Sequence, residues 1–224
     1  MIDFLNTFDT QIFLFLNGIH SAFFDEFMFA FSGRWIWIPF YLSLLYIFIR
    51  NWKKESIWII LALILCIVLA DQISSTIIKN LVQRPRPSHA EELDGLVHIV
   101  NSYRGGKFGF VSSHASNSFS LALFCSLLFR NKVYTWVLFL WAAVTAYSRI
   151  YLGVHYLGDI LGGIIVGVFA ALFCLFLLKK FRPLVLQKRL QVHNTFLQKQ
   201  ESYLPLWTIL FSTLAIVIWS LFAV

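Results

Sequence analysis

The chain has 224 residues, of which 59% are hydrophobic, 18% aromatic and only 13% charged, with a formal net charge of +7. An ordinary soluble domain is about 45–50% apolar and about 25% charged, so this composition excludes a water-soluble globular protein, a disordered tail and a nucleic-acid-binding module. At about 20 residues per membrane span, the length allows about six spans and no separate soluble domain.

Residues 1–33 form the first predicted element. They mix Phe, Leu and Ile with polar and acidic residues such as Asp9, Asp25 and Glu26. This mixture predicts one or two amphipathic helices that lie in the outer interface of the membrane. A seventh span over the same residues is the alternative.

Six long apolar runs follow and predict the transmembrane helices. They cover residues 35–49, 57–78, 119–129 with a start nearer Ser113, 133–146, 160–178 and 206–224. The predicted fold class is therefore all-α: a polytopic membrane helix bundle of about six transmembrane helices with amphipathic N-terminal helices. We expect a single integral-membrane domain over residues 1–224.

Basic residues gather at alternate ends of these spans. They occur in the turns 50–56 and 130–132 and in the segment 179–204. Because Lys and Arg in short loops mark the cytoplasmic side, we expect these three regions to face inward. The region 79–113 and the turn 149–159 are then expected to face outward.

The first polar cluster at the outward side contains Lys79 and Arg86. On a helix these residues lie two turns apart on one face, so both can point at one multiply charged anion. Pro85 and Pro87 are expected to end the helix there. The alternative is that the two cations cap a span and extend to the lipid headgroups.

The second cluster, Ser112, Ser113 and His114, comes directly before a span. Small residues with unpaired backbone N–H groups at a helix N-terminus form a cradle for an anion. The alternative is an ordinary serine N-cap followed by an interfacial histidine.

The third cluster contains Arg149, His155 and Asp159. His155 and Asp159 are four residues apart, so the carboxylate can accept a hydrogen bond from one ring nitrogen and leave the other nitrogen as a nucleophile. A structural His–Asp pair at a helix N-terminus explains the same spacing. Together the three clusters supply what phosphate chemistry needs: cations, uncharged donors, a nucleophile and a proton donor.

The segment 88–110 lies between the first two clusters and carries several acids and histidines. Their spacing fits no specific metal-ligand pattern, so we expect no metal site there. A solvated lid over the site is the preferred interpretation, with Arg104 or Lys107 able to contact a second phosphate or a sugar.

The three motifs resemble the signature of the type 2 phosphatidic acid phosphatase (PAP2) superfamily, which includes lipid phosphate phosphatases and vanadium haloperoxidases. The family pattern is Lys, six residues, Arg-Pro; then Pro-Ser-Gly-His; then Ser-Arg, five residues, His, three residues, Asp. Residues 79–87 and 148–159 match the first and third parts. The second part departs from the pattern, because Val111 and Ser113 replace Pro and Gly.

The resemblance implies a role for each matched residue. His155 attacks phosphorus and forms a phosphohistidine, Asp159 orients His155, and His114 protonates the leaving group and then activates water. Neither a metal nor a cofactor is implied. The implied phosphate-binding residues are Lys79, Arg86, Ser112, Ser113 and Arg149.

The implied function is an integral-membrane phosphatase of the bacterial inner membrane with its active site facing the periplasm. Candidate substrates are lipid A phosphate, undecaprenyl diphosphate, phosphatidylglycerol phosphate and phosphatidic acid, and nucleic acid is not an expected partner. The layout is similar to that of the lipid A 4′-phosphatases of Gram-negative anaerobes. A lipid transporter or flippase that uses the same charged cluster is the alternative, and haloperoxidase chemistry is a further one.

Overall fold

The structure, a computed structural model, describes residues 2–185, 187 and 203–224. All regular elements in these ranges are helices, and the one pairing of extended backbone found among them is an isolated bridge between Pro85 and Phe108. The expected all-α helix bundle is therefore confirmed.

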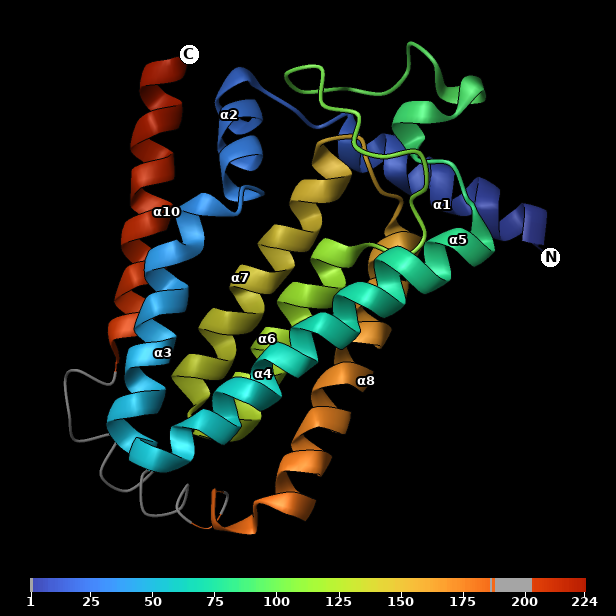
Figure 1. The fold of residues 1–224 in the computed structure, drawn as a ribbon. Helices are drawn as coiled ribbons and strands as arrows, with labels where there is room; N and C mark the ends of the chain where they lie inside the picture. The colour runs from blue at the N-terminus through green and yellow to red at the C-terminus, as the bar shows by residue number, and fades with distance from the viewer. Residues whose placement is uncertain (1, 186, 188–202) are drawn as a thin grey trace.

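Two N-terminal helices precede the bundle. Helix α1 covers Ile2–Asn17 and α2 covers Ala22–Phe31, where the Ser21 side chain accepts a hydrogen bond from the Phe24 backbone as N-cap. The segments Asn6–Asn17 and Ala22–Phe31 are bent by 114° relative to each other. Figure 1 shows α1 running across one end of the bundle. That these helices lie in the outer interface stays a prediction.

Two long helices come next. A short 3-10 turn, η1 (Trp35–Trp37), leads into α3 (Ile38–Trp52), and the turn η2 (Lys53–Glu55) leads into α4 (Ser56–Asp71). Helix α4 continues without a break through a π-helical stretch, η3 (Gln72–Ile78), into α5 (Lys79–Val82). The helix therefore carries Lys79 at its end, and it stops shortly before Pro85, which cannot donate a backbone hydrogen bond.

The remaining helices complete the bundle. They are α6 (Ser113–Phe129), α7 (Lys132–Tyr151), α8 (Leu157–Phe181) and α10 (Leu204–Ala223). Each of the six predicted runs lies on a helix, and α6 begins at Ser113 as expected. The helices are longer than the predicted apolar runs. Helix α7 continues to Tyr151 and α8 begins at Leu157, so both include polar residues that lie outside those runs.

Helix α6 is the inner helix of the bundle and packs against α4, α7 and α8. Gly163 and Gly167 of α8 make this packing close, because a Cβ at either position would lie 2.4 Å from a backbone oxygen of α6. Ser116 and Ser120 of α6 are fully buried. The inner position explains why α6 is more polar in sequence than α4 and α8.

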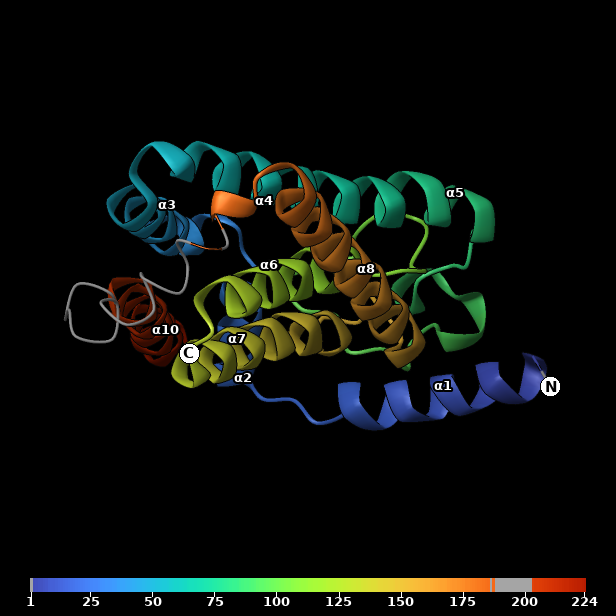
Figure 2. The same cartoon turned by 90° about the horizontal axis from the view of Figure 1, so that it is seen from below.

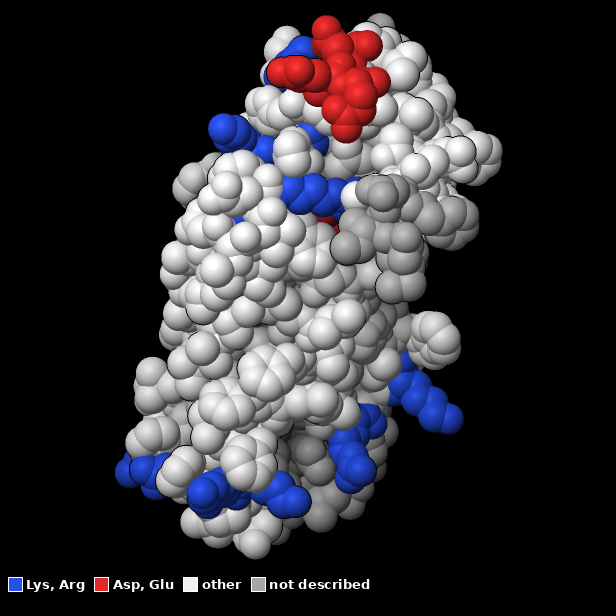
Figure 3. All heavy atoms as spheres, turned by 90° about the vertical axis from the view of Figure 1, so that its right-hand side faces the viewer, with Lys and Arg blue, Asp and Glu red and all other residues white. Residues whose placement is uncertain are grey.

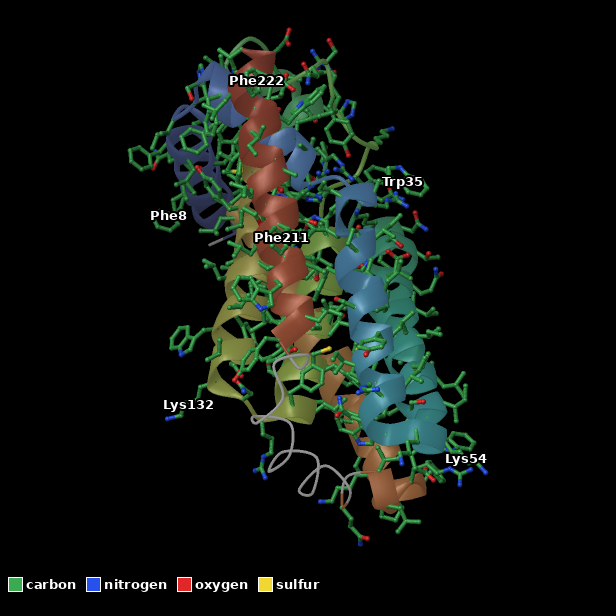
Figure 4. All side chains as sticks on the ribbon, turned by 90° about the vertical axis from the view of Figure 1, so that its left-hand side faces the viewer. Phe8, Trp35, Lys54, Lys132, Phe211 and Phe222 are labelled. Carbon is green, nitrogen blue, oxygen red and sulfur yellow. The ribbon has the colours of Figure 1, made fainter. Side chains whose placement is uncertain are left out.

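The outer helices expose apolar side chains. Trp136 on α7 and Ile165 on α8 expose 77% and 70% of their surface, and Figure 4 shows Phe211 projecting from the middle of α10. On the face seen in Figure 3, Lys and Arg lie toward both ends with a band of uncharged side chains between them. Such a band is what a bilayer-spanning protein presents to lipid.

Four segments are long and apolar enough to cross a membrane: Trp35–Val82, Lys132–Tyr151, Leu157–Phe181 and Leu204–Ala223. The bent pair of N-terminal helices would make a fifth. The expected six spans are not confirmed by this count, because the first segment contains both α3 and α4 and because α6 has only 17 residues and many serines.

The basic end of the bundle is visible in Figure 4, where Lys54 and Lys132 lie far from Phe222. Part of the predicted cytoplasmic segment, residues 188–202 with Lys188, Arg189 and Lys199, lies outside the described residues.

Candidate active site

The three predicted clusters come together at one end of the bundle, the end that the segment 83–112 covers in Figure 1. Lys79 lies in the last turn of the long α4–α5 helix, His114 lies in the first turn of α6, and Arg149 lies in the last turn of α7. His155 lies in the loop before α8, and Asp159 lies in the first turn of α8. The site is thus assembled from helix ends that are distant in sequence.

His155 and Asp159 form the buried centre of the site. The His155 Nδ1 atom lies 3.1 Å from Asp159 Oδ2, and these side chains expose 1% and 0% of their surface. The same carboxylate oxygen accepts a hydrogen bond of 3.1 Å from the backbone N–H of Tyr156, which fixes the start of α8. With Nδ1 held by the carboxylate, Nε2 is the ring nitrogen left for attack.

The electrostatic environment keeps His155 uncharged. Burial lowers the pKa of His155 well below its ordinary value of 6.5, and the positive charges of Arg86, Arg149 and Lys79 lower it further. A hydrogen bond with the backbone of Gly109 opposes this shift. The neutral imidazole is the form that carries a lone pair, so the surroundings favour a nucleophile at neutral pH.

Arg86 is held by the lid segment. Its Nε donates to the Phe108 carbonyl at 3.1 Å and its Nη1 to the Val154 carbonyl at 3.5 Å. Gly105 has a φ of +65°, and a Cβ there would lie 2.6 Å from Arg86 Nη1. Burial lowers the pKa of Arg86 and the charge of Arg149 adds to the effect, but a guanidinium is so strong a base that it stays charged near neutral pH.

Arg149 is 2% exposed and is held from two sides. Its Nη1 donates to the Ser32 hydroxyl, in the link between α2 and α3, and its Nη2 donates to the Tyr103 hydroxyl of the lid at 2.9 Å. Within the described residues, Arg149 Nε is buried without a hydrogen-bond partner. An unpartnered guanidinium N–H in this place is suited to bind a substrate oxygen.

In the second cluster, Ser112 makes contacts within the fold. Its hydroxyl caps α6 by accepting from the Ala115 N–H at 3.4 Å, and its own N–H donates to the Asp159 carbonyl at 2.9 Å. Ser112 is also fully buried. These contacts are those of an ordinary N-cap, in which the hydroxyl oxygen accepts and the backbone N–H is used within the fold. The role of Ser112 in binding phosphate stays a prediction.

His114 and Ser113 instead line a cavity of about 630 Å³ between α3, α4, α6 and α7. The wall is mainly apolar, and Arg34 and Asp71 are among its few charged residues. His114 interacts electrostatically with Arg149, His155, Arg34 and Lys79, which places both histidines and the cations in one electrostatic cluster. The cavity leads from the charged site into the apolar body of the bundle.

Asp71 lies below the site on α4 and contacts α6. Its Oδ1 accepts a hydrogen bond of 3.1 Å from Asn117 Nδ2, and its Oδ2 lies 3.3 Å from the Ser75 hydroxyl. The polar stripe around Asp71 therefore joins two helices. These contacts join α4 to α6 and do not form a row of ionisable groups along a transport path.

Several residues at the site were missed by the sequence reasoning. Arg84 contacts Asp159, Asp9 contacts Arg84, Tyr103 contacts Arg149, and Arg34 lines the cavity. Arg84 stands within the Lys79–Arg86 motif and could have been noticed. Asp9 and Tyr103 carry no sequence signal, because their distance from the motifs in sequence hides their position.

One histidine of the segment 88–110, His98, contacts the N-terminal helices and the link between them. His98 Nε2 lies 2.8 Å from Asp25 Oδ1, and the His98 ring stacks on His20 with centroids 3.7 Å apart. Tyr151 donates to the same Asp25 oxygen at 2.6 Å. In the described part of the chain, no three His, Cys, Asp or Glu residues are grouped so that they could hold a metal ion.

The sequence matches one family profile and is similar over most of its length to two characterised proteins. The PAP2 superfamily profile matches residues 55–183. The chain is 48% identical to the lipid A 4′-phosphatase of Bacteroides thetaiotaomicron over 171 residues, which cover 75% of this chain and 76% of that protein. It is 42% identical to the lipid A 4′-phosphatase of Porphyromonas gingivalis over 161 residues, which cover 71% and 68%.

Solved structures are similar in fold. The crystal structure of Aquifex aeolicus LpxE matches with a TM-score of 0.56 at 26% identity and covers 74% of this chain and 93% of that one. A PAP2-type phosphatidylglycerolphosphate phosphatase from Bacillus subtilis matches with a TM-score of 0.55 at 22% identity, covering 80% and 88%.

Proposed function

The chain belongs to the PAP2 superfamily and is an integral-membrane lipid phosphatase, and from that premise we propose that it removes the 4′-phosphate of lipid A. The choice of lipid is supported by two relatives that carry this activity in their names and match more than two thirds of the chain. The chemistry is supported above all by the buried His155–Asp159 pair, on which the charges of Lys79, Arg86 and Arg149 act.

In the first step, His155 Nε2 attacks phosphorus and the bond between phosphorus and the 4′-oxygen breaks. His114 gives its proton to the leaving oxygen, so that the dephosphorylated lipid departs as an alcohol. The phosphohistidine carries a positive ring, which the Asp159 carboxylate stabilises through Nδ1.

In the second step, water attacks the phosphohistidine and His114 takes its proton. The bond between Nε2 and phosphorus breaks, inorganic phosphate leaves, and His155 returns to its neutral form. The charge that develops on the phosphoryl oxygens is stabilised by fixed donors. The proposed donors are Lys79, Arg86, Arg149 and the first backbone N–H groups of α6, beginning with that of Ser113, and Ser112 supports them as the cap of that helix.

The cavity beside His114 is the proposed place for part of the acyl region of the lipid. Its apolar walls from α3, α4 and α7 suit hydrocarbon, and His114 and Ser113 stand where the cavity adjoins the phosphate site. A lipid bound in this way would bring its phosphate to His155 while its tail stays in an apolar environment.

We further propose six membrane crossings, by α3, α4 with its extension to α5, α6, α7, α8 and α10, in a bacterial inner membrane. The site then faces the periplasm, because Lys54, Lys132 and the basic last turn of α8, with Lys179 and Lys180, mark the opposite end as cytoplasmic. Accessibility of a single introduced cysteine at Lys132 to an impermeant thiol reagent, in spheroplasts and in inverted vesicles, tests this orientation. Labelling in intact spheroplasts would contradict it.

The function is tested with the purified full chain in detergent and in the presence of a chelator. The substrates are lipid A, undecaprenyl diphosphate, phosphatidylglycerol phosphate and phosphatidic acid, and the control is His155→Ala. We expect fastest phosphate release from lipid A, with fragmentation mass spectrometry locating the loss at the 4′ position. Preference for another lipid overturns the proposed substrate, and full activity of His155→Ala overturns the mechanism.

A further inference from the structure

Arg84 joins the catalytic carboxylate to the N-terminal helix. Its Nη1 atom lies 3.2 Å from Asp159 Oδ1 and 2.8 Å from Asp9 Oδ2 on α1. The side chains of Arg84 and Asp9 are 20% and 14% exposed, and that of Asp159 is 0% exposed. The guanidinium is therefore held between two carboxylates, only one of which belongs to the active site.

The two oxygens of Asp159 have separate partners. Oδ2 faces His155 Nδ1 and the Tyr156 N–H, whereas Oδ1 faces Arg84. A carboxylate anchored at both oxygens cannot rotate about its terminal bond without losing one partner. Arg84 thus fixes the direction in which Oδ2 points, and through it the ring of His155.

Helix α1 holds Arg84 in place. Asp9 Oδ1 accepts a hydrogen bond of 2.9 Å from the Gly158 N–H at the start of α8, while Asp9 Oδ2 binds Arg84. A Cβ on Gly158 would lie 2.7 Å from Asp9 Oδ2, so a larger residue there would displace the Asp9 carboxylate. Figure 2 shows α1 beside the end of α8.

Two aromatic rings support the Arg84 guanidinium. Arg84 Cζ lies 3.9 Å from the centroid of the Tyr156 ring, and Phe13 of α1 packs edge-on against the same ring with centroids 5.4 Å apart. The geometry points to Arg84 as a positioning residue for the nucleophile, with α1 as the element that holds it. The inference rests on the proposed function, because positioning matters only if His155 attacks phosphorus.

The charges alternate in sign along this chain of contacts. Asp9 is negative, Arg84 positive, Asp159 negative, and the phosphohistidine ring positive. The positive charge of Arg84 attracts the Asp159 carboxylate, and Asp9 offsets part of the Arg84 charge so that Asp159 keeps its attraction for the His155 ring.

The test compares variants that break the Asp9–Arg84–Asp159 contacts at different points. Arg84→Gln loses both carboxylate contacts, whereas Asp9→Asn loses only the charge on α1 and keeps an oxygen for the Gly158 N–H. Arg84→Lys restores a charge without the planar fork, and Lys132→Gln, at the opposite end of the bundle, controls for the loss of one cation. The measurements are kcat, KM, the rate of phosphoenzyme formation and the thermal midpoint.

We expect Arg84→Gln to lower kcat on the order of 10- to 100-fold, as is typical when a partner of a catalytic carboxylate is lost, with KM changed less than about twofold. Phosphoenzyme formation slows by the same factor, Arg84→Lys recovers part of the loss, and Asp9→Asn loses less than about fivefold. If Arg84→Gln and Asp9→Asn lose kcat equally and their thermal midpoints also fall equally, the contacts have a purely structural role and the inference is overturned. Absence of phosphate release by the unchanged protein from all four lipids would instead overturn the proposed function, and the inference with it.

Discussion

The loop between α7 and α8 and the first turn of α6 each bring one histidine to the site, but they hold it differently. His155 is 1% exposed and its Nδ1 is bound to a buried carboxylate, whose two oxygens are both occupied. His114 is half-buried and lines the cavity that leads into the apolar body of the protein. The nucleophile is thus fixed by packing, whereas the proton donor stands next to the space that the leaving group would fill.

Asp159→Asn changes the contact that fixes His155 and should have the largest effect. The amide keeps the shape but removes the negative charge opposite the phosphohistidine and disturbs the tautomer of His155. We expect kcat to fall on the order of 10³- to 10⁴-fold with little change in KM, as in other His–Asp pairs that lose the acid. Phosphate release from lipid A measures this, and Asp94→Asn, an exposed acid of the lid, is the matched control.

His114→Ala should sharpen the contrast between the two histidines. Loss of a general acid is expected to cost about 10²- to 10³-fold with a lipid substrate, whose leaving alkoxide needs a proton. With an aryl phosphate, whose leaving group departs without protonation, the loss in the phosphorylation step should shrink to less than about tenfold. His155→Ala should be inactive with both substrates. A loss in His114→Ala that is the same for both leaving groups would argue against its role as acid.

The protonation of His155 as a function of pH tests the effect of its buried, positively charged surroundings. Its pKa is lowered well below 6.5 by burial and by three cations, so the ring binds a proton only at a pH below that of an ordinary histidine. As pH falls from 7 to 6, His155 should therefore stay neutral and remain competent. NMR titration of protein labelled in its histidine rings, with His155→Asn to assign the signal, measures this directly. A midpoint at or above 6.5 would contradict the described environment.

Much of the fold followed from the sequence because lipid-facing helices must be continuously apolar. The runs on α3, α4, α7, α8 and α10 were predicted on that ground. Helix α6 was harder to delimit, since its inner position lets Ser116 and Ser120 bond to backbone carbonyls of α4 and of α6 itself. The count of spans remained open because α6 owes its burial to other helices more than to lipid, and because α3 and α4 fall in one continuous apolar segment.

The site was predictable only where a motif is local. His155 and Asp159 are four residues apart, and their contact follows from that spacing. The partners of Arg149, Ser32 and Tyr103, lie 117 and 46 residues away in the chain and left no pattern to read. Ser112 shows the opposite situation, because its position before a helix fits both a phosphate donor and an N-cap, and the structure adds the contact of an N-cap.

Ser113→Gly is expected to have the smallest effect and tests the departure from the family pattern. Residue 113 is the first residue of α6 and already has helical geometry, which serine adopts as well as glycine. The backbone therefore does not need glycine there, and the backbone N–H groups of the turn should keep their positions. We expect kcat/KM for lipid A to change less than about threefold and the free energy of unfolding to fall by about 0.5 kcal/mol, because glycine loses more backbone entropy on folding. A change of more than about tenfold in kcat/KM, at equal stability, would mean that the serine hydroxyl itself contacts the substrate, and α6 would then hold phosphate by a side chain as well as by its backbone.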